Sequence, residues 1–198
     1  MAVRDKQKLI TEILSEVLGQ SAETDKTFSW FINKHLKEHF GLYFNTINKI
    51  FNELNGDDNA IATKRTVPLD CDAYFGGRYN FIFEFDEFQH FSSARLRTLE
   101  HYPKKLKLGF DVNTWKNLCG LHGGKANRYR YNKSTVDFNF PGGRTAQRAY
   151  LDCFRDFLPE IHGLNPTIRI NEFEVAEINS KNLDSYKTIE YLLKDKLS

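Results

Sequence analysis

An aromatic run interrupted by carboxylates, Phe81 to Phe91, constrains the fold of this 198-residue chain more than any other segment. Its composition is that of a buried β-strand, yet it carries Glu84, Asp86 and Glu87. Carboxylates are among the costliest groups to bury without a partner. The strand therefore needs a cation beside it, and oxygen-only ligands favour Mg²⁺ or Mn²⁺.

The strand pattern divides these side chains between two faces. Because side chains alternate along a strand, Ile82, Glu84 and Asp86 share one face, and the intervening phenylalanines share the other. Upstream, Gly76-Gly77 predicts a turn, and residues 66–72 predict the partner strand of a hairpin. The alternative is an edge strand whose carboxylates simply face water.

The hairpin would gather oxygen ligands at one point. Folding at the two glycines brings Asp72 alongside Glu84, with Asp70 two positions away. Gln89 and His90 follow where the strand should end, placed to contact a metal-bound water or a phosphate. The sequence therefore predicts a metal site made by two neighbouring strands.

The order of these residues resembles a known nuclease motif. This segment resembles the motif of the PD-(D/E)XK nuclease superfamily. Asp72 is followed, after eleven intervening residues, by Glu84-Phe-Asp86 and then by Gln89-His90. The likeness is greatest to the branch that contains the very-short-patch repair endonuclease, where an Asp precedes a hydrophobic strand that ends Glu-x-Asp-Gly-x-x-His. Here Glu87 takes the place of that Gly. Residues 144–178 are similar to the helix and strand that close this core, so the resemblance covers residues 66–91 and 144–178.

The resemblance implies both a fold and a function. The expected fold is a mixed α/β (α+β) restriction-endonuclease-like core, with a central mixed, mostly antiparallel sheet flanked by helices. The expected function is Mg²⁺- or Mn²⁺-dependent hydrolysis of DNA phosphodiester bonds, sequence-specific in the manner of type II restriction enzymes. Asp72 and Glu84 would hold the metal, and Asp86 would share it or orient a water. Gln89 and His90 would position the water or a phosphate.

The chain departs from the superfamily at one position. The usual Lys two residues after the Glu is absent, and Asp86 stands there. Candidates for its replacement are Gln89, Arg95, Arg97 and Arg148. The motif can also be aligned so that Glu87-Phe-Gln89 forms the metal-and-water pair. In that alignment Glu87 would bind the metal and Glu84 would be structural. In the resembled fold a preceding helix sometimes adds a carboxylate, and Glu53 is the candidate here.

Charge is distributed unevenly along the chain. Residues 51–100 hold nine acidic and five basic side chains, a net charge of −4. Residues 101–150 hold ten basic and two acidic ones, a net charge of +8, although the whole chain is only +2. A metal-dependent nuclease needs such a basic block to draw a phosphate backbone towards its carboxylates. The predicted DNA-binding residues are Lys125, Arg128, Arg130, Arg144 and Arg148.

Two basic segments have local patterns of their own. Residues 120–131 combine glycines with alternating Arg and Tyr, which predicts either a loop that contacts phosphates and bases or a β-hairpin. Residues 140–148 predict a loop entering a helix, with Thr145 as a cap.

The remaining pattern indicates a single domain over residues 1–198. Residues 1–58 are helical, with apolar periodicity at 6–18 and 28–54 and breaks at Gly41 and Gly56, and a last helix spans 186–197. Residues 92–140 would be a basic recognition insertion. No apolar run is long enough for a membrane span, and the first residues lack the apolar core of a signal peptide. Three cysteines without framework spacing suit the reducing cytoplasm.

Other functions fit part of the pattern. The chain could be a nuclease-fold module that binds nucleic acid without cutting it, a repair or nicking nuclease, or a structural partner protein. The expected partner is double-stranded DNA, although the sequence does not separate DNA from RNA. Cutting both strands would call for a homodimer.

Overall fold

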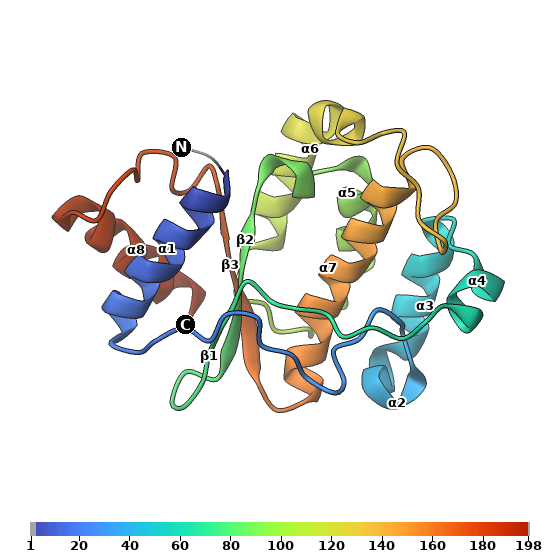
Figure 1. Cartoon of the computed structure of the whole chain (residues 1–198), viewed down its shortest axis with the longest axis horizontal. Coiled ribbons are helices and arrows are strands. Elements are labelled where there is room, and N and C mark those ends of the chain that lie inside the picture. Colours follow the sequence, from blue (N-terminus) through green and yellow to red (C-terminus); the bar gives the residue numbers. More distant parts are fainter. Residues whose placement is uncertain (1–2, 198) are drawn as a thin grey trace.

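A computed structural model describes residues 3–197 (Figure 1). The α-helices in this range are α1 (Val3–Leu18), α2 (Lys37–Phe40), α3 (Phe44–Glu53), α4 (Asp58–Thr63), α5 (Ser93–Glu100), α6 (Val112–Arg128), α7 (Gly143–Ile161) and α8 (Leu183–Lys196). The strands are β1 (Ala73–Phe75), β2 (Phe81–Asp86) and β3 (Asn165–Asn171), and the short 3₁₀ helices are η1 (Gly41–Tyr43) and η2 (Phe88–His90).

β2 is the middle strand of a three-stranded sheet. β1 pairs with it antiparallel, with Ala73 opposite Phe83, and β3 pairs with it parallel, with Phe85 opposite Ile170. The predicted mixed sheet flanked by helices is therefore confirmed. The sheet is not mostly antiparallel, because the chain crosses over through α7 and returns as β3, parallel to β2. The alternative of a solvated edge strand is wrong, since all six residues of β2 are buried.

The hairpin before β2 forms, but its first strand starts later than predicted. The amides of Tyr79 and Asn80 bond to the Gly76 carbonyl in the turn, and the paired strand is β1 rather than residues 66–72. Residues 66–72 instead run beside the segment after α1, where the Leu69 amide bonds to the Phe31 carbonyl. Asp72 consequently lies just before β1, at the edge where strand pairing stops.

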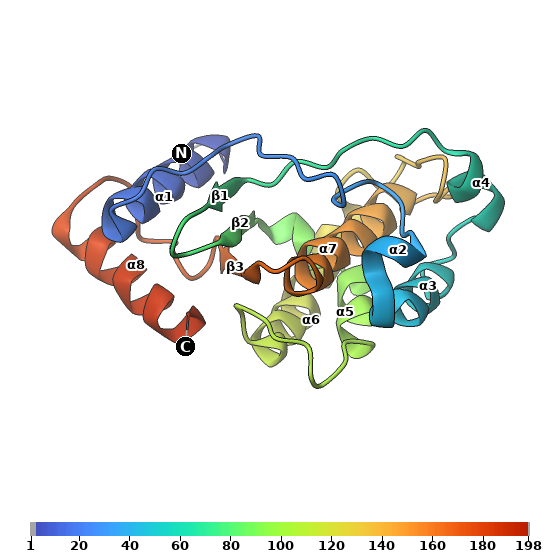
Figure 2. The same cartoon turned by 90° about the horizontal axis from the view of Figure 1, so that it is seen from below.

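The two faces of β2 are covered by different helices, which gives three layers (Figures 1 and 2). The phenylalanines of β2 pack with α1 and α8 in one apolar cluster. Ile82 packs in a second cluster with α3 and α7. This division confirms the alternation predicted from the sequence, and it directs Glu84 and Asp86 towards α7.

The terminal helices were predicted nearly correctly. α1 and α8 match the expected helices at residues 6–18 and 186–197, and they pack against each other. The periodic stretch 28–54 is helical only from Lys37 onward, with a break at Gly41, whose φ is 48°.

The basic segment 120–131 is neither a loop nor a hairpin for most of its length, because α6 continues to Arg128. Asp111 caps this helix by accepting a hydrogen bond from the Thr114 amide. Trp115, Cys119 and Ala126 are buried along one side of α6. Burial of that side therefore outweighs the helix-breaking tendency of the glycines.

α7 confirms the predicted helix before the last strand, but its cap is different. Gly142, with φ 87°, occupies the cap position, and Thr145 lies inside the first turn. At the next residue, a Cβ on Gly143 would lie 1.8 Å from the Phe138 carbonyl oxygen. The first turn of α7 can therefore meet the preceding loop only because residue 143 has no side chain.

Replacing Gly143 with Ala is expected to destabilise the protein by about 1–3 kcal/mol, because the loop must move to admit the methyl group. Urea unfolding followed by circular dichroism measures the change. Gly120→Ala is the matched control, since nothing lies within 4 Å of a Cβ there. That exchange should be neutral or stabilise by up to about 1 kcal/mol. Equal effects of the two variants would contradict the close approach at Gly143.

Two further expectations from the sequence concern membrane spans and cysteines. No helix between residues 3 and 197 combines the length and hydrophobicity needed to cross a membrane. Cys71, Cys119 and Cys153 are all buried and free, in keeping with the absence of framework spacing in the sequence.

Candidate active site

A pocket of about 190 Å³ opens between the end of β2 and α7. Four separate parts of the chain contribute charged or polar side chains to it: α1, the residue before β1, the end of β2 with η2, and α7. Its lining comprises Gln7, Asp72, Glu84, Phe85, Glu87, His90, Arg144, Arg148, Leu151, Asp152 and Arg155. Convergence of titratable groups in one pocket is the arrangement that active sites require.

Asp72 and Glu84 reach this pocket from neighbouring strands. Since Ala73 pairs with Phe83, Asp72 stands opposite Glu84, just beyond the paired residues. Asp72 Oδ2 accepts a hydrogen bond of 2.7 Å from the Phe85 amide. Burial raises the pKa of Asp72. Burial also raises the pKa of Glu84 to about 8, with Arg155 opposing the rise and Asp72 adding to it. The structure thus brings together the two carboxylates that the hairpin was expected to join.

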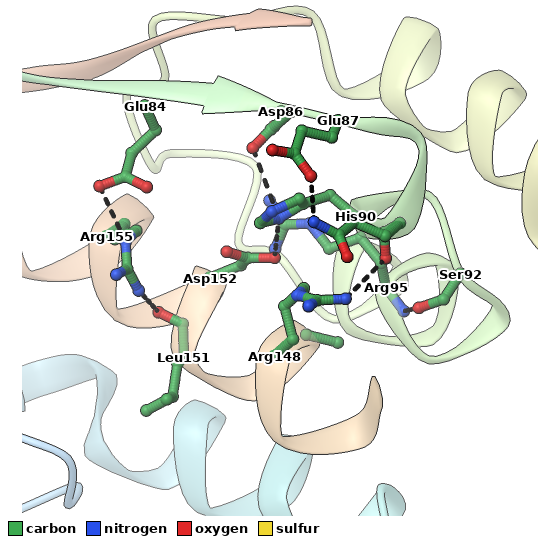
Figure 3. A network of polar contacts seen from close by, with 12 residues as sticks. Glu84, Asp86, Glu87, His90, Ser92, Arg95, Arg148, Leu151, Asp152 and Arg155 are labelled. Atoms are coloured by element: carbon green, nitrogen blue, oxygen red, sulfur yellow. Dashed lines mark hydrogen bonds and ion pairs between the residues drawn. The ribbon is translucent and has the colours of Figure 1, made fainter. Parts of the chain in front are cut away.

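Arg155 of α7 is the cation beside Glu84 (Figure 3). Its Nε lies 2.8 Å from Glu84 Oε1, but neither of these buried atoms makes a hydrogen bond. The guanidinium donates instead to the carbonyls of Leu151 and Asp70. Glu84 Oε1 therefore already has a positive charge from α7 beside it.

His90 and Asp152 form a second pair in the pocket (Figure 3). His90 Nδ1 lies 3.0 Å from Asp152 Oδ2 and 3.6 Å from Asp86 Oδ1. Burial alone would lower the pKa of His90, but the two carboxylates outweigh it and raise that pKa. Burial likewise opposes ionisation of Asp152, yet His90 and Arg169 hold its pKa below the ordinary value. With Nδ1 fixed by a carboxylate, Nε2 is the ring nitrogen free to exchange a proton.

Asp86 does not share the pocket, contrary to the expectation that it would join the metal. It is 1% exposed, and its two oxygens are both occupied. Oδ1 accepts from Arg169 Nη1 and Oδ2 accepts from the Trp115 indole, each at 2.7 Å. The cation that β2 needed at this position is therefore an arginine of β3.

Arg169 belongs to a buried network of charges behind the pocket. Its Nε donates to Asp156 Oδ1 at 2.7 Å, and the other Asp156 oxygen accepts from Arg95 at the same distance. Tyr102 also donates to that oxygen at 2.6 Å. Arg95 is thus committed to the network and does not replace the missing lysine.

The other predicted site residues are divided between the pocket and its surroundings. Glu87 lines the pocket and accepts a hydrogen bond from the Gln89 side chain. Gln89 itself is not among the lining residues, and its buried Oε1 has no hydrogen-bond partner. Arg148 lines the pocket and donates to the Gln89 carbonyl, so it is the one predicted lysine replacement that the structure brings to the site.

Two predicted supporting carboxylates lie elsewhere. Asp70 is exposed and lines a larger neighbouring groove, which shares Gln7 and Asp72 with the pocket. Glu53 is exposed at the end of α3, 3.5 Å from His101, and Arg97 bonds to its carbonyl. The structure therefore places neither Asp70 nor Glu53 among the pocket residues.

The predicted DNA-binding residues fall into three groups. Arg144 and Arg148 are half-buried and line the pocket. Lys125 and Arg130 are exposed beside rings, Lys125 over Phe88 and Arg130 over Tyr129. Arg128 is exposed at the end of α6.

Sequence reasoning missed Gln7, Asp152 and Arg155 as pocket residues. The two α7 residues carried a usable signal, because Arg148, Asp152 and Arg155 recur at helical spacing on one side of the helix. Charges on the side of a helix that faces a sheet need partners, and Glu84 and His90 provide them.

A magnesium ion would need fewer protein ligands than a structural metal centre. In residues 3–197 no cluster of three or more His, Cys, Asp or Glu side chains is arranged to hold a metal. Mg²⁺, however, is commonly held by one or two carboxylates together with water and substrate phosphate. Asp72 and Glu84 supply two carboxylates to the pocket, and Glu84 Oε1 already pairs with Arg155 at 2.8 Å.

Comparison with known proteins adds no relative. No known protein family, curated protein sequence or solved structure matches this chain.

Proposed function

We propose that this protein is a Mg²⁺-dependent endonuclease, able also to use Mn²⁺, that hydrolyses phosphodiester bonds of DNA. One observation carries the proposal: a carboxylate pair, Asp72 and Glu84, shares a pocket with the His90–Asp152 pair and with arginines. Carboxylates, an oriented imidazole and guanidinium groups are together the side chains that metal-assisted phosphodiester hydrolysis needs.

Asp72 and Glu84 are the residues that would hold the metal. When bound, the ion would lower the pKa of a water and stabilise negative charge on the phosphate. Arg155 keeps a positive charge beside Glu84 and so limits repulsion between the carboxylates and a phosphate. The two lining residues near the start of α7, Arg144 and Arg148, are placed to bind phosphate oxygens.

His90 acts as the general base in this scheme. Its Nε2 removes a proton from the attacking water, the water oxygen bonds to phosphorus, and the bond to the leaving sugar oxygen breaks. Asp152 holds the ring through Nδ1 and stabilises the imidazolium that forms. The leaving oxygen then takes a proton from solvent.

Sequence-specific cutting of double-stranded DNA is the form of this activity that we propose first, in the cytoplasm where such DNA would be met. A single pocket cuts one strand, so cutting both would use two copies of the chain in a homodimer. A monomer would instead nick.

The test is digestion of mixed-sequence plasmid DNA with Mg²⁺ or Mn²⁺, against the same reaction in EDTA. Wild type should cut, and Asp72→Asn should not, because it loses a charge at the metal while keeping an oxygen for the Phe85 amide. Asp70→Asn is the matched control, two residues away and exposed, and it should cut like wild type.

Discrete fragments would establish sequence specificity, and a smear would indicate general cutting. The proposal fails if purified wild type leaves DNA intact with every divalent metal tried. It fails equally if Asp72→Asn cuts as well as wild type, because the activity would then belong to another site or another protein.

A second candidate is a module with this arrangement that binds DNA without cutting it. The contact between Arg155 and Glu84 favours it, since the chain supplies its own cation at a carboxylate that a metal would use. In that case DNA would be retained in a gel shift, and divalent metals would leave the thermal stability unchanged.

A further inference from the structure

Partly exposed aromatic rings lie along and next to α6, and one of them contacts the pocket residue Arg148. Phe88 of η2 meets Tyr129, just after α6, edge to face with ring centroids 5.7 Å apart. Earlier in α6, the His122 ring stacks on the Phe173 ring, with centroids 4.2 Å apart and an angle of 7° between the rings. Phe173 is 37% exposed, so this stacked pair reaches the surface. We refer to these four residues as the ring platform.

Cations lie against the ring platform and connect it to the pocket. Lys125 Nζ is 4.1 Å from the centre of the Phe88 ring. The guanidinium groups of Arg130 and Arg148 lie 5.3 and 5.7 Å from the centre of Tyr129. Arg148 also lines the pocket, so one side chain touches both the ring platform and the candidate active site.

Part of the exposed surface of α6 is formed by glycines. Gly120 and Gly124 lie one turn apart, and nothing in the described chain lies within 4 Å of a Cβ at either position. Glycine at an exposed helix position costs about 1 kcal/mol relative to Ala, and no internal contact compensates here. Leu121 between them is 77% exposed. α6 contains no acidic residue, so its surface is positive as well as open.

From these observations we infer that the ring platform binds an unpaired segment of one strand of the DNA substrate and leads it into the pocket, an inference that rests on the proposed nuclease function. Bases stack on the rings, Lys125, Arg128 and Arg130 face the backbone, and the glycines let that backbone approach α6 closely. Arg148, which contacts both the ring platform and the pocket, then binds the strand next to Asp72 and Glu84.

Single-stranded DNA fits this surface better than a duplex. Ring faces are useful only to bases that are not already stacked in a duplex. Contacts made through the rings should tolerate many sequences, so any sequence specificity of cutting would come from other contacts.

The test compares a fluorescein-labelled single-stranded oligonucleotide with the same oligonucleotide annealed to its complement, by fluorescence anisotropy in EDTA. Wild type should bind the single strand more tightly. Tyr129→Leu and Phe173→Leu should each weaken that binding about 5- to 150-fold and leave duplex binding unchanged. Tyr129→Trp, which keeps a stacking ring, should bind like wild type. Tyr191→Leu is the matched control, because Tyr191 is 74% exposed on α8.

The inference is overturned if the duplex binds as tightly as the single strand, or if the two leucine variants bind like wild type. Thermal unfolding of each variant excludes loss of binding through misfolding, and recovery in Tyr129→Trp does so independently. Adding Mg²⁺ in a separate assay tests cutting of the same oligonucleotides. Binding without cutting would reject the nuclease but keep the ring platform, whereas cutting with unchanged leucine variants would reject the ring platform alone.

Discussion

The stability of metal-free Glu84→Gln relative to wild type is expected to be greater at pH 8 than at pH 5, by about 3.5 kcal/mol. Burial raises the pKa of Glu84 in the folded protein to about 8, against 4.5 for the ordinary group. A carboxyl with a raised folded-state pKa contributes stability that is complete below pH 4.5 and is lost as pH rises through 8. Glutamine resembles the protonated carboxyl but does not ionise, so the variant keeps this stability at high pH.

The measurement is urea unfolding of both proteins in EDTA at pH 5 and pH 8. Glu38→Gln, an exposed residue of α2, is the matched control and should behave like wild type at both pH values. Mg²⁺ should then stabilise wild type at pH 8 but not Glu84→Gln, because a ligand that binds only the folded state raises its stability. A difference between Glu84→Gln and wild type that does not change with pH would show that Arg155 keeps Glu84 ionised throughout.

Arg169→Met is expected to destabilise the protein by about 3–5 kcal/mol, which is the usual loss when one partner of a buried ion pair is removed. Arg169 is fully buried, and its guanidinium bonds to Asp86 and Asp156. Without it, the Asp86 carboxylate on the central strand keeps the Trp115 indole and only the more distant His90, 3.6 Å away, as a basic neighbour.

Chemical denaturation measures this loss, with Arg65→Met as the control, since Arg65 is exposed. Adding Asp86→Asn to Arg169→Met should restore part of the stability, because it removes the charge that lost its partner. A loss below about 1 kcal/mol for Arg169→Met would place the pair among exposed ion pairs and contradict its burial.

Local sequence patterns predicted the parts of the fold that depend on neighbours in the chain. The alternation along β2 required only a period of two, and the joining of Asp72 to Glu84 required only a short turn at Gly76-Gly77. The helix and strand after residue 143 were expected from the resemblance to the nuclease core, and the start of the helix from the loop pattern at residues 140–148. These features are fixed by contacts within a few residues, so they can be read without the fold.

The identity of the cations could not be read in the same way. The alternating pattern showed that Glu84 and Asp86 needed positive charge, and a metal was expected for both. The structure gives Asp86 an arginine 83 residues later in the sequence, because β3 lies beside β2. Arg155 reaches Glu84 through the packing of α7 on the sheet. Neither pairing can be predicted from the sequence around β2, since both depend on how distant elements pack.

The hydrogen bond from the Phe85 amide to Asp72 gives one side chain two roles. β1 begins only at Ala73, so the Asp72 carboxylate takes the place of a strand carbonyl at that edge of the sheet. A substitution that removed its oxygens would leave a main-chain donor of the central strand unpaired as well as remove a ligand. Position 72 therefore has two requirements, an acceptor for the Phe85 amide and a negatively charged ligand. Of the residues close in size, Asn supplies only the acceptor, whereas Asp supplies both.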